Sequence, residues 1–163
     1  FLEEKKPLGT AGPIANAIDL LQENFLVMNG DLLTTLNFKA LYDDHINSGS
    51  SATIAVHERI VNVDYGVIEY DSSSCLIGYN EKPSLEFDVS MGINVIKKAS
   101  IISLIEKNHY LDLPDLMMKI SNKDPQSVKC YKEECKWLDM GRLDDYSIAT
   151  ELFEEDRSLY LGD

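Results

Sequence analysis

The most informative segment of the chain is Phe25-Leu26-Val27-Met28-Asn29-Gly30-Asp31. Its apolar run stops at a small residue and a carboxylate, which is typical of a buried strand in a parallel sheet. Ligands of open α/β sheets bind just beyond the carboxyl ends of such strands. We therefore expect Asp31 to lie at the rim of a crevice as a metal ligand. The alternative is an aspartate that only turns the chain after a strand.

The segments around this strand predict alternating helices and strands. Thr10 is expected to cap a helix over about residues 11–22, and Gly49 to end a second helix over 38–48. A further strand at 52–57 completes a strand, helix, strand unit. The two strands of this unit should run parallel, with a right-handed crossover between them.

The middle of the chain has a different pattern. Short β-rich runs at 65–70, 76–80 and 89–96 are separated by clusters of Ser, Pro and Asp. Because no long helix lies between the first two runs, we expect mixed or antiparallel pairing at this edge of the sheet.

The last third returns to helices. Asp112, Pro114 and Asp115 predict a capping box at the start of a helix over 113–122. The other expected elements are helices at 101–107 and 144–153 and strands at 127–131 and 136–138. The chain thus predicts one α/β domain over residues 1–163, with helices flanking a mixed, mainly parallel sheet in three layers.

Composition narrows the class of partner. Twenty-eight acidic and fifteen basic residues give the 163-residue chain a formal net charge of -13. This charge repels nucleic acid and anionic membrane surfaces, although local cations, helix N-termini or a divalent ion can still bind a small anion. Three cysteines without metal-ligand spacing, and no apolar run of the ~20 residues that cross a bilayer, indicate a soluble cytoplasmic protein.

A second carboxylate ends an apolar strand late in the chain. In Trp137-Leu138-Asp139-Met140-Gly141-Arg142, Asp139 ends an apolar strand and lies close to a glycine, which is similar to the arrangement at Asp31. If the two strands are neighbours, both carboxylates can reach one ion. Two carboxylates together with substrate phosphates and water are the usual ligands of Mg²⁺. Taken alone, Asp139 more often caps the following turn.

Two further patterns contain candidate ligand contacts. Pro7-Leu8-Gly9-Thr10-Ala11-Gly12 has two glycines at a helix start, where free N–H groups can donate to a base edge or a phosphate. Glu81-Lys82-Pro83 places a cation suited to a phosphate beside an acceptor suited to sugar hydroxyls. A plain glycine loop and a solvated turn are the commoner readings of two such short patterns.

Together these patterns resemble the sugar-phosphate nucleotidyltransferase family, in particular hexose-1-phosphate guanylyltransferases and thymidylyl- or uridylyltransferases. The resemblance spans nearly the whole chain. Members of the family have six motifs in a fixed order, and similar motifs occur here at residues 7–12, 29–31, 65–67, 81–83, 92–95 and 137–146.

The resemblance implies a Rossmann-like, partial GT-A-like fold and a nucleotidyl transfer. In this reaction an oxygen of a sugar 1-phosphate attacks the α-phosphate of a nucleoside triphosphate, and pyrophosphate leaves. Asp31 and Asp139 would hold Mg²⁺ and would form the catalytic set together with Lys82. The implied nucleotide contacts are Leu8, Gly9, Thr10, Ala11, Asn29 and Gly30, and the implied sugar contacts are Gly66, Glu81, Lys82, Gly92 and Asn94.

The sequence departs from the family pattern in two ways. The family's first glycine-rich loop, G-x-G-x-R, and the Pro-Lys pair that follows it do not occur in the sequence. We therefore expect an N-terminally truncated catalytic domain with little or no activity of its own, whose exposed sheet favours a homo-oligomer. Ser90, Met91 and Asn94 also differ from the Asn-Ala pair and the aromatic residue of many members, which leaves the sugar undetermined.

The expected activity is that of a sugar-1-phosphate nucleotidyltransferase. GTP is favoured because the motifs at residues 7–12 and 137–146 resemble those of guanylyltransferases. One alternative is a glycosyltransferase that consumes the nucleotide-sugar, and another is a non-catalytic module that only binds it. Lys82 argues against the first alternative, because a lysine placed for a sugar 1-phosphate has no role there. Dependence of binding on Mg²⁺ would argue against the second.

Overall fold

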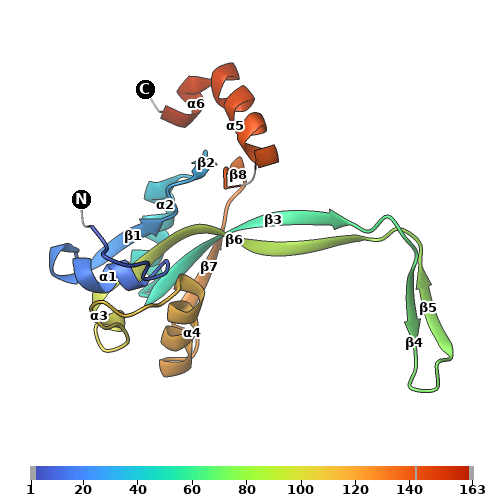
Figure 1. Ribbon diagram of the computed structural model, residues 1–163, viewed down its shortest axis with the longest axis horizontal. Helices are drawn as coiled ribbons and strands as arrows, with labels where there is room; N and C mark the ends of the chain where they lie inside the picture. The colour runs from blue at the N-terminus through green and yellow to red at the C-terminus, as the bar shows by residue number, and fades with distance from the viewer. Residues whose placement is uncertain (1–2, 142, 162–163) are drawn as a thin grey trace.

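The computed structural model describes residues 3–141 and 143–161 and has a four-stranded sheet at its centre (Figure 1). Strand β6 runs antiparallel to both β1 and β3, whereas β7 is parallel to β3. Three of the four strands therefore point in one direction, and the predicted mixed, mainly parallel sheet is confirmed. The strand order is β1 (Asn24–Met28), β6 (Ser84–Lys97), β3 (Ala52–Asn62) and β7 (Val128–Lys132).

Strands β1 and β3 run parallel, as predicted, but they are not neighbours. Strand β6 lies between them, and its Val95 pairs with Leu26 on one side and with Thr53 on the other. The crossover between β1 and β3 contains α2 (Phe38–Ser48), which Gly49 ends in the left-handed conformation (φ 65°), as predicted. The strand, helix, strand unit is thus divided by a strand from later in the chain.

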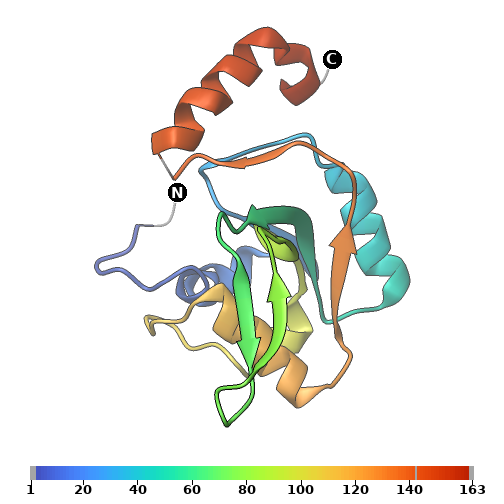
Figure 2. The same ribbon diagram turned by 90° about the vertical axis from the view of Figure 1, so that its right-hand side faces the viewer.

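Helices cover both faces of the sheet (Figure 2). On the first face Leu116 packs in one core with Phe25 and Ile96. On the second face Leu41 packs in another core with Val95. These two cores produce the three layers that the sequence predicts. The helices of the first face are α1 (Gly12–Ala17), α3 (Lys98–Ile101) and α4 (Leu113–Lys123), and α2 covers the second face.

The predicted cap of α1 is wrong, because its N-cap is Ala11 and not Thr10. Asp112 is the N-cap residue of α4, as predicted, but its side chain makes no capping hydrogen bond, so the capping box with Asp115 is not formed. Instead the Thr10 hydroxyl oxygen accepts a hydrogen bond of 2.8 Å from the Leu113 amide, at the first turn of α4. A residue 103 positions earlier in the sequence therefore caps this helix, which local sequence patterns do not reveal.

Several helix boundaries also differ from the predicted ones. The helix expected at 11–22 ends at Ala17 and continues only as the 3-10 turn η1 (Ile18–Leu20), and the helix expected at 101–107 is reduced to α3. The C-terminal helix is close to its expected range. It is α5 (Leu143–Glu155), followed by α6 (Arg157–Leu161).

A second, two-stranded sheet lies beside the central one. It pairs β2 (Leu32–Thr34) with β8 (Trp137–Asp139) in antiparallel register, with Leu32 opposite Asp139. This pairing brings the segments after β1 and before α5 together. In the described residues we find no helix with the length and apolar character needed to cross a membrane.

Residues 57–89 form a two-stranded arm that projects away from the rest of the molecule (Figure 1). Strands β3 and β6 continue as an antiparallel pair to Asn62 and Ser84, and a hairpin follows at the far end. The antiparallel pairing predicted for this region is confirmed. The hairpin consists of β4 (Val67–Tyr70) and β5 (Leu76–Asn80).

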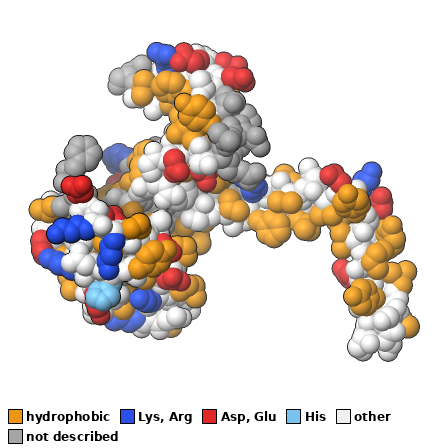
Figure 3. Space-filling view, viewed as in Figure 1, with side chains coloured by type: hydrophobic (Ala, Val, Ile, Leu, Met, Phe, Trp, Pro, Cys, Tyr) orange, Lys and Arg blue, Asp and Glu red, His pale blue; other side chains and the backbone are white. Residues whose placement is uncertain are grey.

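The arm exposes many apolar side chains, which Figure 3 shows along its length. Of the twenty-one exposed large apolar residues in the described part of the chain, eleven lie on the arm. They are Ile60, Val61, Tyr65, Val67, Ile68, Tyr70, Leu76, Ile77, Tyr79, Leu85 and Phe87.

Candidate active site

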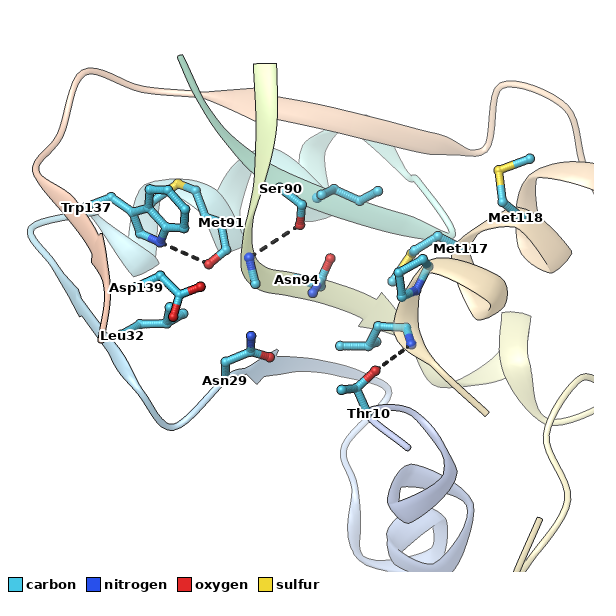
Figure 4. Close-up of a pocket in the computed structure, with 14 residues that line it drawn as sticks. Thr10, Asn29, Leu32, Ser90, Met91, Asn94, Met117, Met118, Trp137 and Asp139 are labelled. Carbon is cyan, nitrogen blue, oxygen red and sulfur yellow. Dashed lines mark hydrogen bonds between the residues drawn. The ribbon is translucent and has the colours of Figure 1, made fainter. Parts of the chain in front are cut away.

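A cavity of about 490 Å³ opens beyond the carboxyl end of β1, between the start of α4 and strand β8 (Figure 4). This is the position where ligands bind in open α/β sheets. Of the residues singled out from the sequence, Thr10, Asn29, Gly92, Asn94 and Asp139 line it. Its remaining lining residues are Leu32, Ile54, Ser90, Met91, Leu113, Pro114, Met117, Met118 and Trp137.

Asp31 and Asp139 lie close together beside this cavity, and of the two only Asp139 is among its lining residues. The Met140 amide donates to the Asp31 carbonyl oxygen at 2.8 Å, next to the pairing of β2 with β8. A Cβ atom placed on Gly141 would lie 3.1 Å from Asp139 Oδ1 and 3.2 Å from Asp31 Oδ2. The two oxygens are therefore at most 6.3 Å apart, which is the sum of these two distances.

This carboxylate pair fits a divalent cation. Opposite ligands of an octahedral Mg²⁺ are about 4.2 Å apart, given metal–oxygen distances of about 2.1 Å, and this separation lies within the 6.3 Å limit. Within residues 3–141 and 143–161 no group of three or more His, Cys, Asp or Glu side chains is arranged to hold a metal ion. Asp31 and Asp139 would therefore need phosphate oxygens and water as further ligands, which is the usual situation for Mg²⁺.

Asn29 and Gly92 form the floor of the cavity. The Asn29 backbone amide donates to the Gly92 carbonyl oxygen at 3.0 Å. Gly92 has a φ of 73°, and a Cβ atom on it would lie only 2.7 Å from Asn29 Nδ2. Both the backbone conformation and the close contact thus require glycine here. Gly30, in contrast, is exposed, and a Cβ atom on it would meet nothing within 4 Å.

Gly92 also marks a β-bulge at the base of the arm. Ile54 pairs with Asn94, but the next pair joins Val56 to Ser90. Strand β6 therefore has extra residues at this point, which bends the strand and changes its twist. The bulge places Ser90, Gly92 and Asn94 on the cavity wall.

The loop Leu8–Gly12 is only partly available to a ligand. Leu8 and Ala11 are buried in the protein, and Thr10 is the loop residue that lines the cavity. The free N–H groups expected at this helix start are already engaged. The Thr10 amide donates to Asp112 Oδ1 at 3.0 Å, and the Ala11 and Gly12 amides donate to a backbone carbonyl at 2.8 and 2.9 Å.

Gly66, Glu81 and Lys82 are not at the cavity. They lie where the arm meets its terminal hairpin, and none of them is among the lining residues. The structure does bring Gly66 and Glu81 together, because a Cβ atom on Gly66 would lie 2.8 Å from Glu81 Oε2. The uninterrupted strands β3 and β6 keep all three residues away from Asp31 and Asp139.

Sequence reasoning missed the apolar wall that α4 contributes. Leu113, Pro114, Met117 and Met118 line the cavity opposite Asp139 (Figure 4). The helix itself was expected at 113–122, but its sequence pattern gives no sign that Leu113 and Met117 reach a cavity. Trp137 was singled out only as part of a sequence motif. In the structure its Nε1 donates to the Met91 carbonyl oxygen at 3.0 Å.

Comparison with known proteins agrees with this geometry. A family model described as "Nucleotidyl transferase" matches residues 1–156. The chain belongs to this family. It is 33% identical over 154 residues to the catalytic subunit beta of mannose-1-phosphate guanylyltransferase of Drosophila melanogaster, covering 90% of the chain and 40% of the relative. It is also 33% identical over 161 residues to mannose-1-phosphate guanyltransferase of Schizosaccharomyces pombe, covering 94% and 43%.

Solved structures of nucleotidyl transferases share the fold. The crystal structure of HddC from Yersinia pseudotuberculosis matches with a TM-score of 0.65 and 25% identity, covering 92% of this chain and 64% of that one. The predicted fold and family are thereby confirmed. The chain spans about two fifths of the length of the two curated relatives above.

Proposed function

We propose that the chain is part of a sugar-1-phosphate nucleotidyltransferase that uses GTP. A phosphate oxygen of the sugar 1-phosphate would form a bond to the α-phosphorus of the triphosphate, and the bond from that phosphorus to the oxygen bridging to the β-phosphate would break. Pyrophosphate leaves with the electron pair of the broken bond. The observation that carries this proposal is the proximity of the Asp31 carboxylate to Asp139, which lines a cavity together with Thr10 and Asn29.

The chemistry needs positioning and charge neutralisation more than a covalent intermediate. Asp31 and Asp139 would hold Mg²⁺, which neutralises charge on the triphosphate when bound. Gly9 and Thr10, together with Asn29 and Gly30, would contact the nucleotide, whereas Leu8 and Ala11 are buried and support the loop. Gly92 and Asn94 would contact the sugar.

Lys82 has a conditional place in this proposal. A lysine is a compact charge suited to a sugar phosphate, and Glu81 and the Gly66 backbone are suited to sugar hydroxyls. Because the arm holds Gly66, Glu81 and Lys82 away from the cavity, their contribution requires the arm to bend toward it. While the arm is extended, the Lys82 ammonium group is not at the cavity.

GTP is favoured because both relatives above are named as guanylyl- or guanyltransferases of mannose 1-phosphate. The proposal is tested by titrating the chain with GTP in a calorimeter, with and without Mg²⁺. Tighter binding in Mg²⁺ is the expected result, and absence of GTP binding under both conditions would overturn the proposal. GTP binding that ignores Mg²⁺ would favour a non-catalytic nucleotide-binding module.

We also propose that a second copy of the chain covers the arm, giving a homo-oligomer. The chain exposes 11062 Å² of surface, whereas a compact monomer of its 18.4 kDa exposes about 8200 Å². A standard interface needs only about 800 Å² from each partner. The excess surface, with the exposed tyrosines and aliphatic residues of the arm, is therefore sufficient for a stable dimer.

Cytoplasmic location is a further proposal. Cys75, Cys130 and Cys135 are free, and Cys75 and Cys130 are exposed. Exposed free thiols are typical of proteins in a reducing compartment.

A further inference from the structure

The loop Leu8–Gly12 is fastened to the segment that begins α4. The Leu111 amide donates to the Leu8 carbonyl oxygen at 2.9 Å. In return, the Leu111 carbonyl oxygen accepts from the amides of Ala11 and Gly12 at 2.8 and 2.9 Å. These backbone bonds join two segments about a hundred residues apart, so the loop does not depend on its own sequence alone for its shape.

The carboxylate of Asp112 adds the side-chain part of this attachment. Its Oδ1 accepts from the Thr10 amide at 3.0 Å and from the Thr10 hydroxyl at 3.3 Å, and its Oδ2 accepts from the Tyr110 hydroxyl at 2.7 Å. The same Thr10 hydroxyl oxygen accepts from the Leu113 amide. Thr10 is thus held at its backbone and at its side chain.

The electrostatics agree with a charged Asp112. The hydrogen bond from Tyr110, and then that from the Thr10 amide, hold the pKa of the Asp112 carboxyl below its usual range. The carboxylate therefore remains ionised at neutral pH. Hydrogen bonds to an ionised acceptor are stronger than those between neutral groups.

Gly9 shows how closely the two segments approach. It has a φ of 76°, and a Cβ atom on it would lie 2.6 Å from the Leu111 carbonyl oxygen and 2.7 Å from Asp112 Oδ1. No side chain fits between the loop and the carboxylate. The contact is therefore possible only with glycine at this position.

Thr10 and Leu113 line the same cavity, so Asp112 joins two of its walls. We propose that Asp112 is a positioning residue for the nucleotide, acting through Thr10 rather than by touching the ligand. This inference rests on the proposed function. By fixing Thr10 relative to α4, Asp112 sets the distance between the two cavity walls that would hold the nucleotide. Because the loop is already ordered, less conformational entropy is lost when the nucleotide binds.

The test measures GTP and mannose 1-phosphate binding to the full chain by calorimetry in Mg²⁺. Asp112→Ala is expected to weaken GTP binding at least tenfold and mannose 1-phosphate binding less than threefold. Asp112→Asn keeps an oxygen that can accept from Thr10, so it should bind GTP within about threefold of the unmodified chain. Asp115→Ala, an exposed aspartate in the same first turn of α4, is the matched control and should change neither affinity.

The outcomes separate this inference from the proposed function. If the unmodified chain does not bind GTP, the proposed function fails and the inference fails with it. If it binds GTP and Asp112→Ala binds equally well, or loses both ligands equally, only the positioning role is overturned. Should Asp112→Ala fail to fold by circular dichroism, Tyr110→Phe decides. It removes only the bond to Oδ2, and it should weaken GTP binding but not mannose 1-phosphate binding; equal binding of GTP would overturn the role.

Discussion

Asp139 Oδ1 and Asp31 Oδ2 lie within 6.3 Å of each other, although 108 positions separate the two residues in the sequence. The pairing of β2 with β8 creates this proximity, because it sets Leu32 opposite Asp139 and leaves Asp31 beside Met140. A divalent cation is attracted to two neighbouring negative charges. We therefore expect this pair to respond to divalent ions.

Replacing either carboxylate should abolish the effect of Mg²⁺ on GTP binding. Asp31→Asn and Asp139→Asn retain shape and hydrogen bonding but remove the charge that holds the ion. We expect GTP affinity in Mg²⁺ to fall at least tenfold for each variant, with an unchanged circular dichroism spectrum. Asp19→Asn, which removes only an exposed ion pair with Lys107, is the control. A full Mg²⁺ effect in either test variant would remove the metal assignment.

Gly92→Ala should destabilise the protein. The left-handed conformation costs a residue with a Cβ atom roughly 1–2 kcal/mol, and the methyl group would also displace the Asn29 side chain. Urea unfolding should therefore show a loss of at least about 1 kcal/mol. Gly30→Ala is the matched control on the same rim, where a Cβ atom meets nothing within 4 Å. Equal stability of the two variants would contradict the requirement for glycine at position 92.

His45 predicts an acid-sensitive fold. It is buried between Thr53 Oγ1 at 2.9 Å and Asn24 Oδ1 at 3.1 Å, and burial, followed by the charge of Lys97, lowers its pKa from 6.5. Below pH 6.5 the unfolded chain therefore binds a proton that the folded chain does not.

Stability attributable to His45 should be complete above pH 6.5 and should fall as the pH drops toward the lowered folded pKa, by up to about 1.4 kcal/mol per pH unit. Urea unfolding between pH 7.5 and pH 5 measures this slope. His45→Gln should be less stable at neutral pH and should have a shallower slope. Identical slopes in the two proteins would show that His45 does not carry the effect.

The arm predicts self-association that a charge can prevent. Ile68 and Tyr79 are cross-strand partners near the end of the arm, and both are exposed. Ile68→Glu should convert a dimer into a monomer in sedimentation experiments, because it places a charge in the centre of the proposed interface. Leu20→Glu, at an exposed leucine of η1, should leave the dimer intact. A monomer at every concentration of the unmodified chain would overturn the proposal.

The isolated chain should release little or no pyrophosphate from GTP and mannose 1-phosphate. Lys82 lies on the arm, so the cavity does not hold the cation expected at the sugar phosphate. A coupled pyrophosphate assay measures this, and turnover near the common enzyme range of about 1–1000 per second would contradict the expectation.

Sequence patterns predicted the parts of this structure that depend on local spacing. The apolar run before Asp31 predicted the position of β1, but β1 is not the buried parallel strand expected: it lies at the edge of the sheet, pairs with the antiparallel β6 and fully buries only Phe25. The similar ending at Asp139 predicted a second carboxylate near Asp31. The metal hypothesis required the strands that precede Asp31 and Asp139 to be neighbours, and they are not, because β1 pairs with β6; the two residues are instead brought together by the pairing of β8 with β2, which follows Asp31. Local patterns thus predicted the strand ends, and the resemblance of six short motifs indicated the family.

What the sequence did not reveal depends on contacts between distant segments. The local sequence pattern predicts that Thr10 caps the helix that follows it. Thr10 instead caps α4, because backbone hydrogen bonds with Leu111 hold its loop beside that helix. The separation of Lys82 from the cavity was also not predictable, since it follows from β3 and β6 continuing past the bulge at Gly92. Periodicity identifies strands, but it does not determine how far two strands remain paired.

The bulge at Gly92 has a mechanical consequence. The wall of the cavity and the pivot of the arm are the same few residues, so a ligand that moves Ser90 or Gly92 also rotates everything beyond them. Between Gly92 and Ser84 the strand is roughly 26 Å long at 3.3 Å per residue, so a 10° rotation displaces its far end by about 5 Å. Small changes at this wall of the cavity would thereby be amplified at the position of Lys82.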